Sequence, residues 1–230
     1  MKLCVFDIDG TLTNTLNSDD LAFRFVLRNL HNINLSDELW ETYKIKTTGT
    51  DSGLIFSIYK DFYNTELTNE LYLNFRNEFV ELLKNDIKLS PQNFTEIYGT
   101  KQLFEFLNKQ KQLAYSIATG SWYESAVAKL KAININTDNL IISGADKFQV
   151  RAEIIQNSIN LAKIKFNQEN FSEIIYVGDG VWDFVSSKLL NIKFIGIDSN
   201  QNNKLKNEGA GEIYPNIYEL LNNCDVFKLE

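Results

Sequence analysis

From residue 99 to residue 222, segments of helical and of strand character alternate, and this alternation constrains the fold more than any other feature of the sequence. Apolar runs typical of strands occur at 113–118, 139–142, 174–177 and 194–197. Helical spacing occupies 99–109, 123–132, 152–163, 182–190 and 218–222. Such alternation predicts a doubly wound α/β fold, in which helices cover both faces of a parallel sheet. Ligands of these sheets bind at the carboxyl ends of the strands.

The first ninety residues differ from this pattern. Residues 2–6 form a short apolar run and predict a buried strand, but no further strand is evident between residues 14 and 85. Helical spacing is found instead, at 54–62, at 67–82 and in a first helix with Leu21, Phe25, Leu27 and Leu30 near one face. We therefore predict an α/β core of residues 1–14 and 89–230, interrupted by an all-helical domain of residues 15–88.

Charge and composition narrow the possible partners. The formal net charge is −7, which argues against a nucleic-acid or anionic-membrane binder because such proteins present basic patches. No run approaches eighteen apolar residues, and two cysteines make no disulfide framework. We expect a cytoplasmic protein whose partner is a small molecule. An anionic ligand would need a local source of positive charge, from a metal, a cationic side chain or helix N-termini.

Two aspartates follow the first predicted strand, in the segment Asp7-Ile8-Asp9-Gly10-Thr11. Residues two apart in extended chain point the same way, so the carboxylates of Asp7 and Asp9 should face one region. Two such carboxylates repel each other unless a cation or a shared proton lies between them. A strand followed by an ordinary turn would explain the pair equally well, so the pair alone does not decide its role.

Polar residues also follow the other predicted strands. Thr119-Gly120-Ser121 follows 113–118, and Gly178-Asp179-Gly180-Val181-Trp182-Asp183 follows 174–177. Between these segments, Lys147 and Arg151 stand before or at the start of a predicted helix. Each has an ordinary alternative: Ser121 is a good helix N-cap, and aspartates are favoured in a first helical turn.

Taken in order, these four segments resemble the motifs of the haloacid dehalogenase superfamily, and the resemblance covers nearly the whole chain. It implies a Rossmann-like core with a helical cap domain, of the kind found in phosphoglycolate phosphatase-like members. It implies that Asp7 attacks phosphorus and forms an aspartyl-phosphate, while Asp9 acts as general acid and base. Metal binding, in this family of Mg²⁺, would fall to Asp7, Asp9, Asp179 and Asp183.

The same resemblance suggests roles for the remaining motif residues. Thr119, Gly120 and Ser121 would bind the transferring phosphoryl group, with Thr11 nearby. Either Arg151 or Lys147 would neutralise its charge. We favour Arg151, because Arg151-Ala152-Glu153 resembles the family version in which the cation directly precedes Ala-Glu. The commoner pattern, a lysine followed by two prolines, is absent.

The helical domain contains one polar, glycine-containing break, Thr47-Thr48-Gly49-Thr50-Asp51. By resemblance this loop reaches toward the substrate, so Thr48, Gly49 and Asp51 are the candidate specificity residues. A plain connection between helices, with Thr50 or Asp51 as N-cap, is the alternative.

Together these observations predict a Mg²⁺-dependent phosphatase acting on a small phosphate monoester. A sugar-phosphate mutase of the same superfamily is the first alternative. Related mutases commonly use a histidine and a lysine of the cap, and the only histidine here is His31, which we expect at a helix end on the surface. A catalytically silent binding protein is the second. The sequence names neither the ester nor the oligomeric state.

Overall fold

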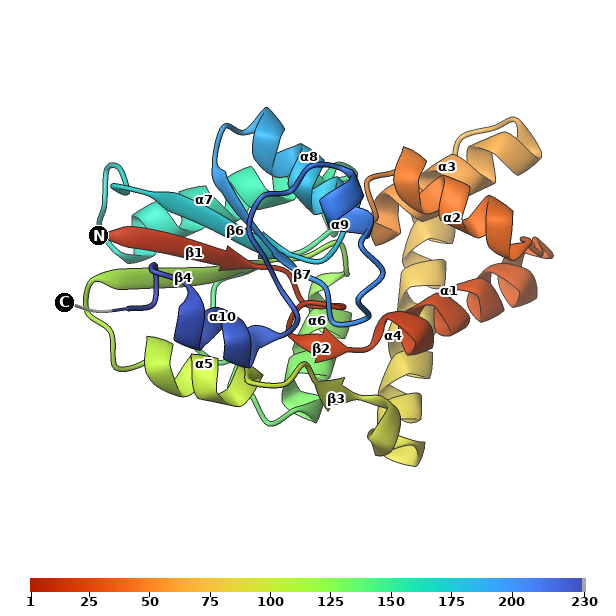
Figure 1. The fold of residues 1–230 in the computed structure, drawn as a ribbon. Coiled ribbons are helices and arrows are strands. Elements are labelled where there is room, and N and C mark those ends of the chain that lie inside the picture. Colours follow the sequence, from red (N-terminus) through yellow and green to blue (C-terminus); the bar gives the residue numbers. More distant parts are fainter. Residues whose placement is uncertain (229–230) are drawn as a thin grey trace.

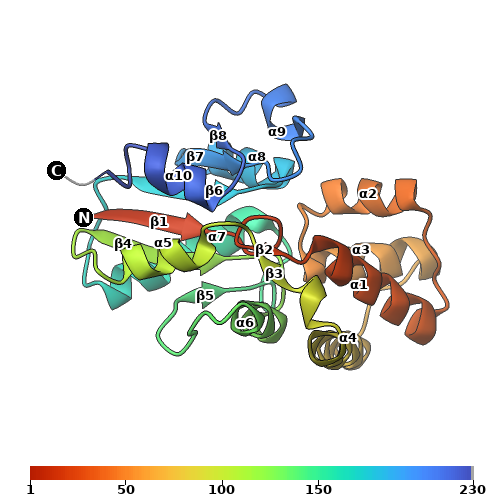
Figure 2. The same ribbon diagram turned by 60° about the horizontal axis from the view of Figure 1, so that its bottom comes forward.

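The computed structural model describes residues 1–228 and contains a six-stranded parallel sheet (Figures 1 and 2). Its strands lie in the order β5-β4-β1-β6-β7-β8. They are β1 (Lys2–Phe6), β4 (Leu113–Ala118), β5 (Ile142–Ser143), β6 (Ile174–Gly178), β7 (Lys193–Ile197) and β8 (Ile213–Tyr214). The central β1 pairs on both sides, so that Phe6 lies opposite Ile117 of β4 and Val177 of β6. The predicted α/β fold is confirmed.

Alternate residues of β1 feed two separate apolar cores, as the two-residue period of a strand requires. Leu3 and Val5 pack in the core under α7 (Arg151–Lys165), on one face of the sheet. Cys4 and Phe6 pack in the core on the other face, together with residues of α5 (Thr100–Leu107) and α6 (Tyr123–Ala132). All four side chains have no exposed surface. A strand buried on both faces needs an unbroken apolar sequence, which is what residues 3–6 provide.

The remaining elements of this part of the chain are short or flank the sheet. α8 (Val181–Leu189) packs beside α7, and α10 (Ile217–Asn223) packs against α5. α9 (Lys204–Asn207) precedes β8. A two-stranded antiparallel ribbon joins β2 (Thr13–Asn14) to β3 (Thr95–Glu96), with a 3₁₀ turn at Pro91–Asn93 just before it. This ribbon lies where the chain leaves β1 and where it returns from the helical insertion.

Four helices occupy the insertion and lie beyond the carboxyl end of β1 (Figure 1). They are α1 (Leu16–His31), α2 (Asp37–Lys46), α3 (Asp51–Tyr63) and α4 (Asn69–Leu89). The last three begin at Ser36, Thr50 and Thr68, whose hydroxyls accept a hydrogen bond from a backbone N–H of the first turn. α2 was not expected from the sequence. Of its ten residues only Trp40 and Tyr43 are buried, so its apolar pattern is weak.

The buried face of α1 differs from the one expected. Leu21, Phe25 and Leu30 are exposed, with 59%, 46% and 38% of their surface accessible. The helix buries Leu27 as expected, and beside it Ala22, Phe23 and Val26. His31, expected on the surface, is buried against the rings of Tyr59 and Phe75, and burial lowers its pKa. Among residues 1–228, no helix is both long enough and apolar enough to cross a membrane.

Candidate active site

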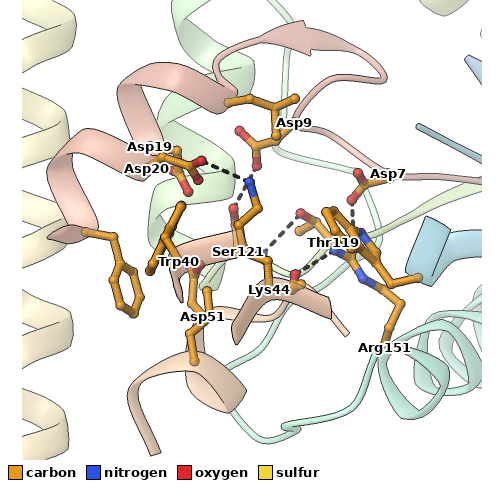
Figure 3. Close-up of a pocket in the computed structure, with 16 residues that line it drawn as sticks. Asp7, Asp9, Asp19, Asp20, Trp40, Lys44, Asp51, Thr119, Ser121 and Arg151 are labelled. Carbon is orange, nitrogen blue, oxygen red and sulfur yellow. Dashed lines mark hydrogen bonds and ion pairs between the residues drawn. The ribbon is translucent and has the colours of Figure 1, made fainter. Parts of the chain in front are cut away.

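A small pocket lies between the carboxyl end of the sheet and the helical insertion (Figure 3). Most of its wall comes from the strand ends and from α1, α2 and the loop before α3. The lining residues are Asp7, Asp9, Leu16, Asp19, Asp20, Phe23, Trp40, Lys44, Gly49, Asp51, Leu54, Thr119, Gly120, Ser121, Arg151 and Trp182. Four segments far apart in the sequence therefore meet at one place, as expected for a parallel sheet.

Asp7 forms a buried ion pair with Arg151. The Arg151 Nη1 donates to Asp7 Oδ1 at 2.8 Å, and both side chains are only 4% exposed. Burial raises the pKa of Asp7 to about 7, against the opposing effect of Arg151. A carboxylate that points into a pocket and is held by one fixed cation is suited to nucleophilic attack.

Arg151 is the first residue of α7 and also binds the insertion. Its Nη2 donates to the Gly49 carbonyl at 2.7 Å, and its backbone N–H donates to the Thr48 hydroxyl at 3.0 Å. Its Nε lies 3.5 Å from Asp183 Oδ1. Lys147, the other candidate cation, is exposed and does not line the pocket. Of the two, Arg151 is the one placed at Asp7.

Asp9 is held by three donors from different elements. Lys129 Nζ lies 2.8 Å from Oδ1 and 2.9 Å from Oδ2, and the Ser121 hydroxyl donates to Oδ2 at 2.8 Å. The Thr15 hydroxyl also donates to Oδ1. Burial alone would raise the pKa of Asp9, but Lys129 and the two hydroxyls outweigh it and lower that pKa. The sequence did not suggest Lys129, because a lysine in the middle of a helix carries no signal of burial.

A second acidic group lies beside Asp7. Carboxylate oxygens of Asp7, Asp179 and Asp183 lie within 4.8 Å of one another, and the Thr11 hydroxyl donates to Asp179 at 3.3 Å. Gly10 has a φ of +81°, and a Cβ there would lie 2.2 Å from Asp179 Oδ2, so only glycine allows this approach. Burial raises the pKa of both Asp179 and Asp183. Three clustered carboxylates, those of Asp7 and Asp183 buried and that of Asp179 partly buried, fit a hard cation such as Mg²⁺.

Asp183 differs from the other two members of this group. Its Oδ2 accepts the Gly180 N–H at 3.0 Å, and its Oδ1 accepts the Tyr176 hydroxyl at 3.1 Å. Both oxygens are therefore already engaged, and one also faces Arg151. This arrangement suits orientation of Arg151 or of a metal-bound water better than direct ligation.

The loop after β4 forms one side of the pocket. The side chains of Thr119 and Ser121 are buried, and the Thr119 hydroxyl accepts the Ser121 N–H at 3.2 Å. A Cβ on Gly120 would lie 2.0 Å from the Gly49 carbonyl and 2.6 Å from Arg151 Nη2. Gly120 therefore permits the close contact between this loop and the insertion. Thr119 and Ser121 contribute hydroxyls to the pocket wall, where an anion could be bound.

Two of the three candidate residues in the predicted specificity loop line the pocket, and the third does not. Gly49 and Asp51 line the pocket, whereas Thr48 does not and instead contacts Arg151. Thr48 and Gly49 both have left-handed backbones, with φ of 55° and 59°, an unusual conformation for a β-branched residue. Asp51 is buried; its N–H donates to the Gly120 carbonyl and its carboxylate accepts the Trp122 N–H. The loop is thus fixed to both Arg151 and the β4–α6 connection.

Further polar residues of the insertion line the pocket and were not expected from the sequence. Asp19 and Asp20 come from α1, and Lys44 comes from α2. Lys44 lies 2.9 Å from Asp20 and 3.4 Å from Glu41. In the sequence these residues look like an ordinary solvated helix face, since only the position of the insertion over the sheet brings them to the site.

Comparison with known proteins identifies the family and the fold. Residues 4–197 match the family model described as haloacid dehalogenase-like hydrolase. A hydrolase from Pseudomonas syringae has a similar structure, with 22% identity, full coverage of both chains and a TM-score of 0.72. CbbY from Rhodobacter sphaeroides, solved with phosphate, has 14% identity over 95% of each chain and a TM-score of 0.69.

A predicted phosphoglycolate phosphatase from Haemophilus somnus is also similar in structure, with 20% identity over 96% of each chain and a TM-score of 0.62. No curated protein matches the sequence. At these identities the structural likeness concerns the fold, whereas the family model matches most of the sequence. The resemblance inferred from the four motifs is therefore confirmed, and the chain belongs to the haloacid dehalogenase-like hydrolases.

Proposed function

We propose that this hydrolase is a Mg²⁺-dependent phosphatase that uses Asp7 as the nucleophile and Asp9 as the general acid and base. The observation that carries the proposal is the buried pair of Asp7 and Arg151, which faces the same pocket as Asp9. A metal site beside the nucleophile adds to it. Solved relatives of similar fold include CbbY, which was crystallised with phosphate and with xylulose-(1,5)bisphosphate.

The chemistry proceeds in two displacements. An Asp7 oxygen attacks phosphorus, the bond to the leaving oxygen breaks, and that oxygen takes a proton from Asp9. The products of this step are the free alcohol and an aspartyl-phosphate on Asp7. Water then attacks phosphorus and gives a proton to Asp9, while the bond to Asp7 breaks. Arg151 and the hydroxyls of Thr119 and Ser121 hold the phosphoryl oxygens in both steps.

The acidic group beside Asp7 would hold Mg²⁺, with Asp7 and Asp179 as the carboxylate ligands and Asp183 behind them. The ion would supply positive charge to the transferring phosphoryl group. The direct test of the function is release of phosphate from an aryl phosphate with Mg²⁺ present, and its loss in excess chelator. Absence of turnover under both conditions would support the alternative of a catalytically silent binding protein.

Addition of Mg²⁺ should stabilise the fold, and more so at pH 8 than at pH 5. Without metal, Asp7 titrates near pH 7 in the folded protein and near 3.8 in the unfolded chain, and Asp179 and Asp183 shift the same way. The folded state thus retains protons that the unfolded state has lost, so metal-free stability falls as pH rises between about 4 and 7. Mg²⁺ binds the ionised form and should restore stability above this range.

Thermal unfolding with and without MgCl₂ at the two pH values measures this effect. Asp179→Asn is the matched variant and should lose most of the metal-induced rise in Tm. An equal rise at both pH values, or an undiminished rise in the variant, would contradict the metal assignment.

The insertion side of the pocket selects against an anionic leaving group. Asp19, Asp20 and Asp51 line it; Asp19 is paired with Lys129 behind the wall, and Lys44, the lysine in the wall, is paired with Asp20. Arg151 is occupied by Asp7 and the Gly49 carbonyl. Among the described residues that line the pocket, no cation is left for a second anionic group. An anionic leaving group would therefore be desolvated without a cation to pair with and would lie near the carboxylate of Asp20, and like charges brought together in a closed site cost several kcal/mol.

We therefore expect 2-hydroxyethyl phosphate to exceed phosphoglycolate in kcat/KM by about tenfold or more. The two esters have nearly the same size and differ in a terminal hydroxyl or carboxylate. Phosphate release from each gives the ratio. In Asp20→Asn, Lys44 loses its closest carboxylate, and the ratio should fall toward one. A wild-type preference for phosphoglycolate would show that the pocket charges do not govern selection.

The mutase alternative is not favoured by the position of His31. This side chain is buried between aromatic rings of the insertion and does not line the pocket. Hydrolysis of the phosphoenzyme by water remains the proposed second step.

A further inference from the structure

Lys129 is a lysine with no exposed surface, held between the α/β core and the helical insertion. It lies on α6, and its ammonium group meets Asp9 of the core and Asp19 of α1. Its Nζ also donates to the Ser121 hydroxyl at 2.8 Å. A fully buried lysine is rare, and its charge must be compensated by the groups around it.

The contacts of Lys129 with Asp9 fix the direction of that carboxylate. Both oxygens lie within 2.9 Å of Nζ, and Ser121 braces one of them. Lys129 itself does not line the pocket, so it stands behind Asp9 and does not reach the substrate. Lys129, Ser121 and Thr15 all donate to the ionised carboxylate, so a proton that Asp9 takes up replaces one of these contacts while the other oxygen still accepts from Lys129.

An ordinary packing role would not need this residue. An apolar side chain would fill the same space without the cost of burying a charge. The ammonium group contacts Asp9, Asp19 and Ser121 together. Packing alone does not explain why a charge is buried at this position.

Resting on the proposed function of Asp9, we propose that Lys129 is a positioning residue for the general acid and base. It aims the Asp9 carboxyl at the leaving oxygen. Asp19, which comes from the insertion, anchors Lys129 in that place. Asp9 is thereby aligned by a contact that joins both parts of the molecule.

The test is the dependence of kcat/KM on the leaving group, because kcat/KM reports the steps up to release of the alcohol. The substrates are a series of phosphate monoesters, from 4-nitrophenyl phosphate to phenyl and alkyl phosphates. Good leaving groups depart without a proton, whereas poor ones need it from Asp9. In Lys129→Met we expect a loss of a few-fold for 4-nitrophenyl phosphate and about 10²-fold for an alkyl phosphate.

Three variants make the comparison decisive. Lys131→Met changes an exposed lysine of the same helix and should behave as wild type. Lys129→Arg keeps the charge and should recover part of the loss on alkyl esters. If Lys129→Met does not fold, Asp19→Asn combined with Lys129→Met removes the carboxylate that would be left unpaired, and should show the same steep dependence.

Asp9→Asn separates failure of this inference from failure of the proposed function. If Asp9→Asn depends on the leaving group no more steeply than wild type, Asp9 is not the acid and the proposed function is wrong at that residue. If kcat/KM depends steeply on the leaving group in Asp9→Asn, Asp9 is the acid. If a folded Lys129→Met then loses kcat/KM equally for all esters, Lys129 serves only packing, and the inference is overturned.

Discussion

Asp7→Asn should lower kcat by at least about 10⁴-fold, a loss in the range seen when a covalent nucleophile is removed. An amide is nearly the same size as a carboxylate but is a poor nucleophile, so the first displacement cannot proceed. The pair with Arg151 at 2.8 Å places this carboxylate at the pocket wall, whereas Asp183, the other carboxylate near Arg151, does not line the pocket. Phosphate release with saturating Mg²⁺ is the measurement.

The fold of Asp7→Asn should survive. Asp7 is a buried acid with a raised pKa beside Asp179 and Asp183, so a neutral amide removes repulsion that the metal-free protein must bear. We expect its Tm without metal to equal or exceed that of the wild type. Wild-type turnover in a folded Asp7→Asn protein would remove the central assignment.

Arg151→Ala should have the second-largest effect, with kcat lowered by about 10²–10³-fold, as for loss of one transition-state contact. The change deletes the cation at Asp7 and also the hydrogen bond to the Gly49 carbonyl. KM should rise as well, because the Gly49 loop loses one of its contacts with the core. Arg151→Lys should recover little, since an ammonium cannot span Asp7 and Gly49 as the planar guanidinium does.

Lys147→Ala is the matched control for Arg151→Ala. Lys147 is exposed and outside the pocket, so its replacement should change kcat only a few-fold. The reverse result, with Lys147→Ala inactive and Arg151→Ala nearly normal, would show that Lys147 and not Arg151 neutralises the phosphoryl group.

The residues that meet at the strand ends could be predicted from the sequence, because one physical rule governs where these ends lie. Parallel strands bring their carboxyl ends to one edge, so Asp7, Thr119 and Asp179 were expected to meet before any contact was known. The boundaries of β4 and α6 also follow from the apolar spacing and agree with the structure.

The insertion was harder to predict because its helices bury aromatic residues among themselves. Phe23 contacts Trp40, Phe75 and Trp122, so the buried side of α1 is built around Phe23 and keeps only Leu27 of the apolar residues expected there. Asp19 and Lys129 are 110 residues apart in sequence, and their contact depends on how α1 lies against α6. Long-range packing of this kind leaves no local pattern.

The guanidinium of Arg151 has a consequence for how substrates are chosen. One group touches both the nucleophile and the Gly49 carbonyl, so the loop and the reactive centre are set at the same moment. An ester that binds but keeps the loop away from Arg151 leaves Asp7 without its aligned cation. Such an ester is held but not cleaved. On the proposed mechanism, discrimination would therefore take place after binding, as a difference in turnover number, and a tight ligand of this protein need not be its substrate.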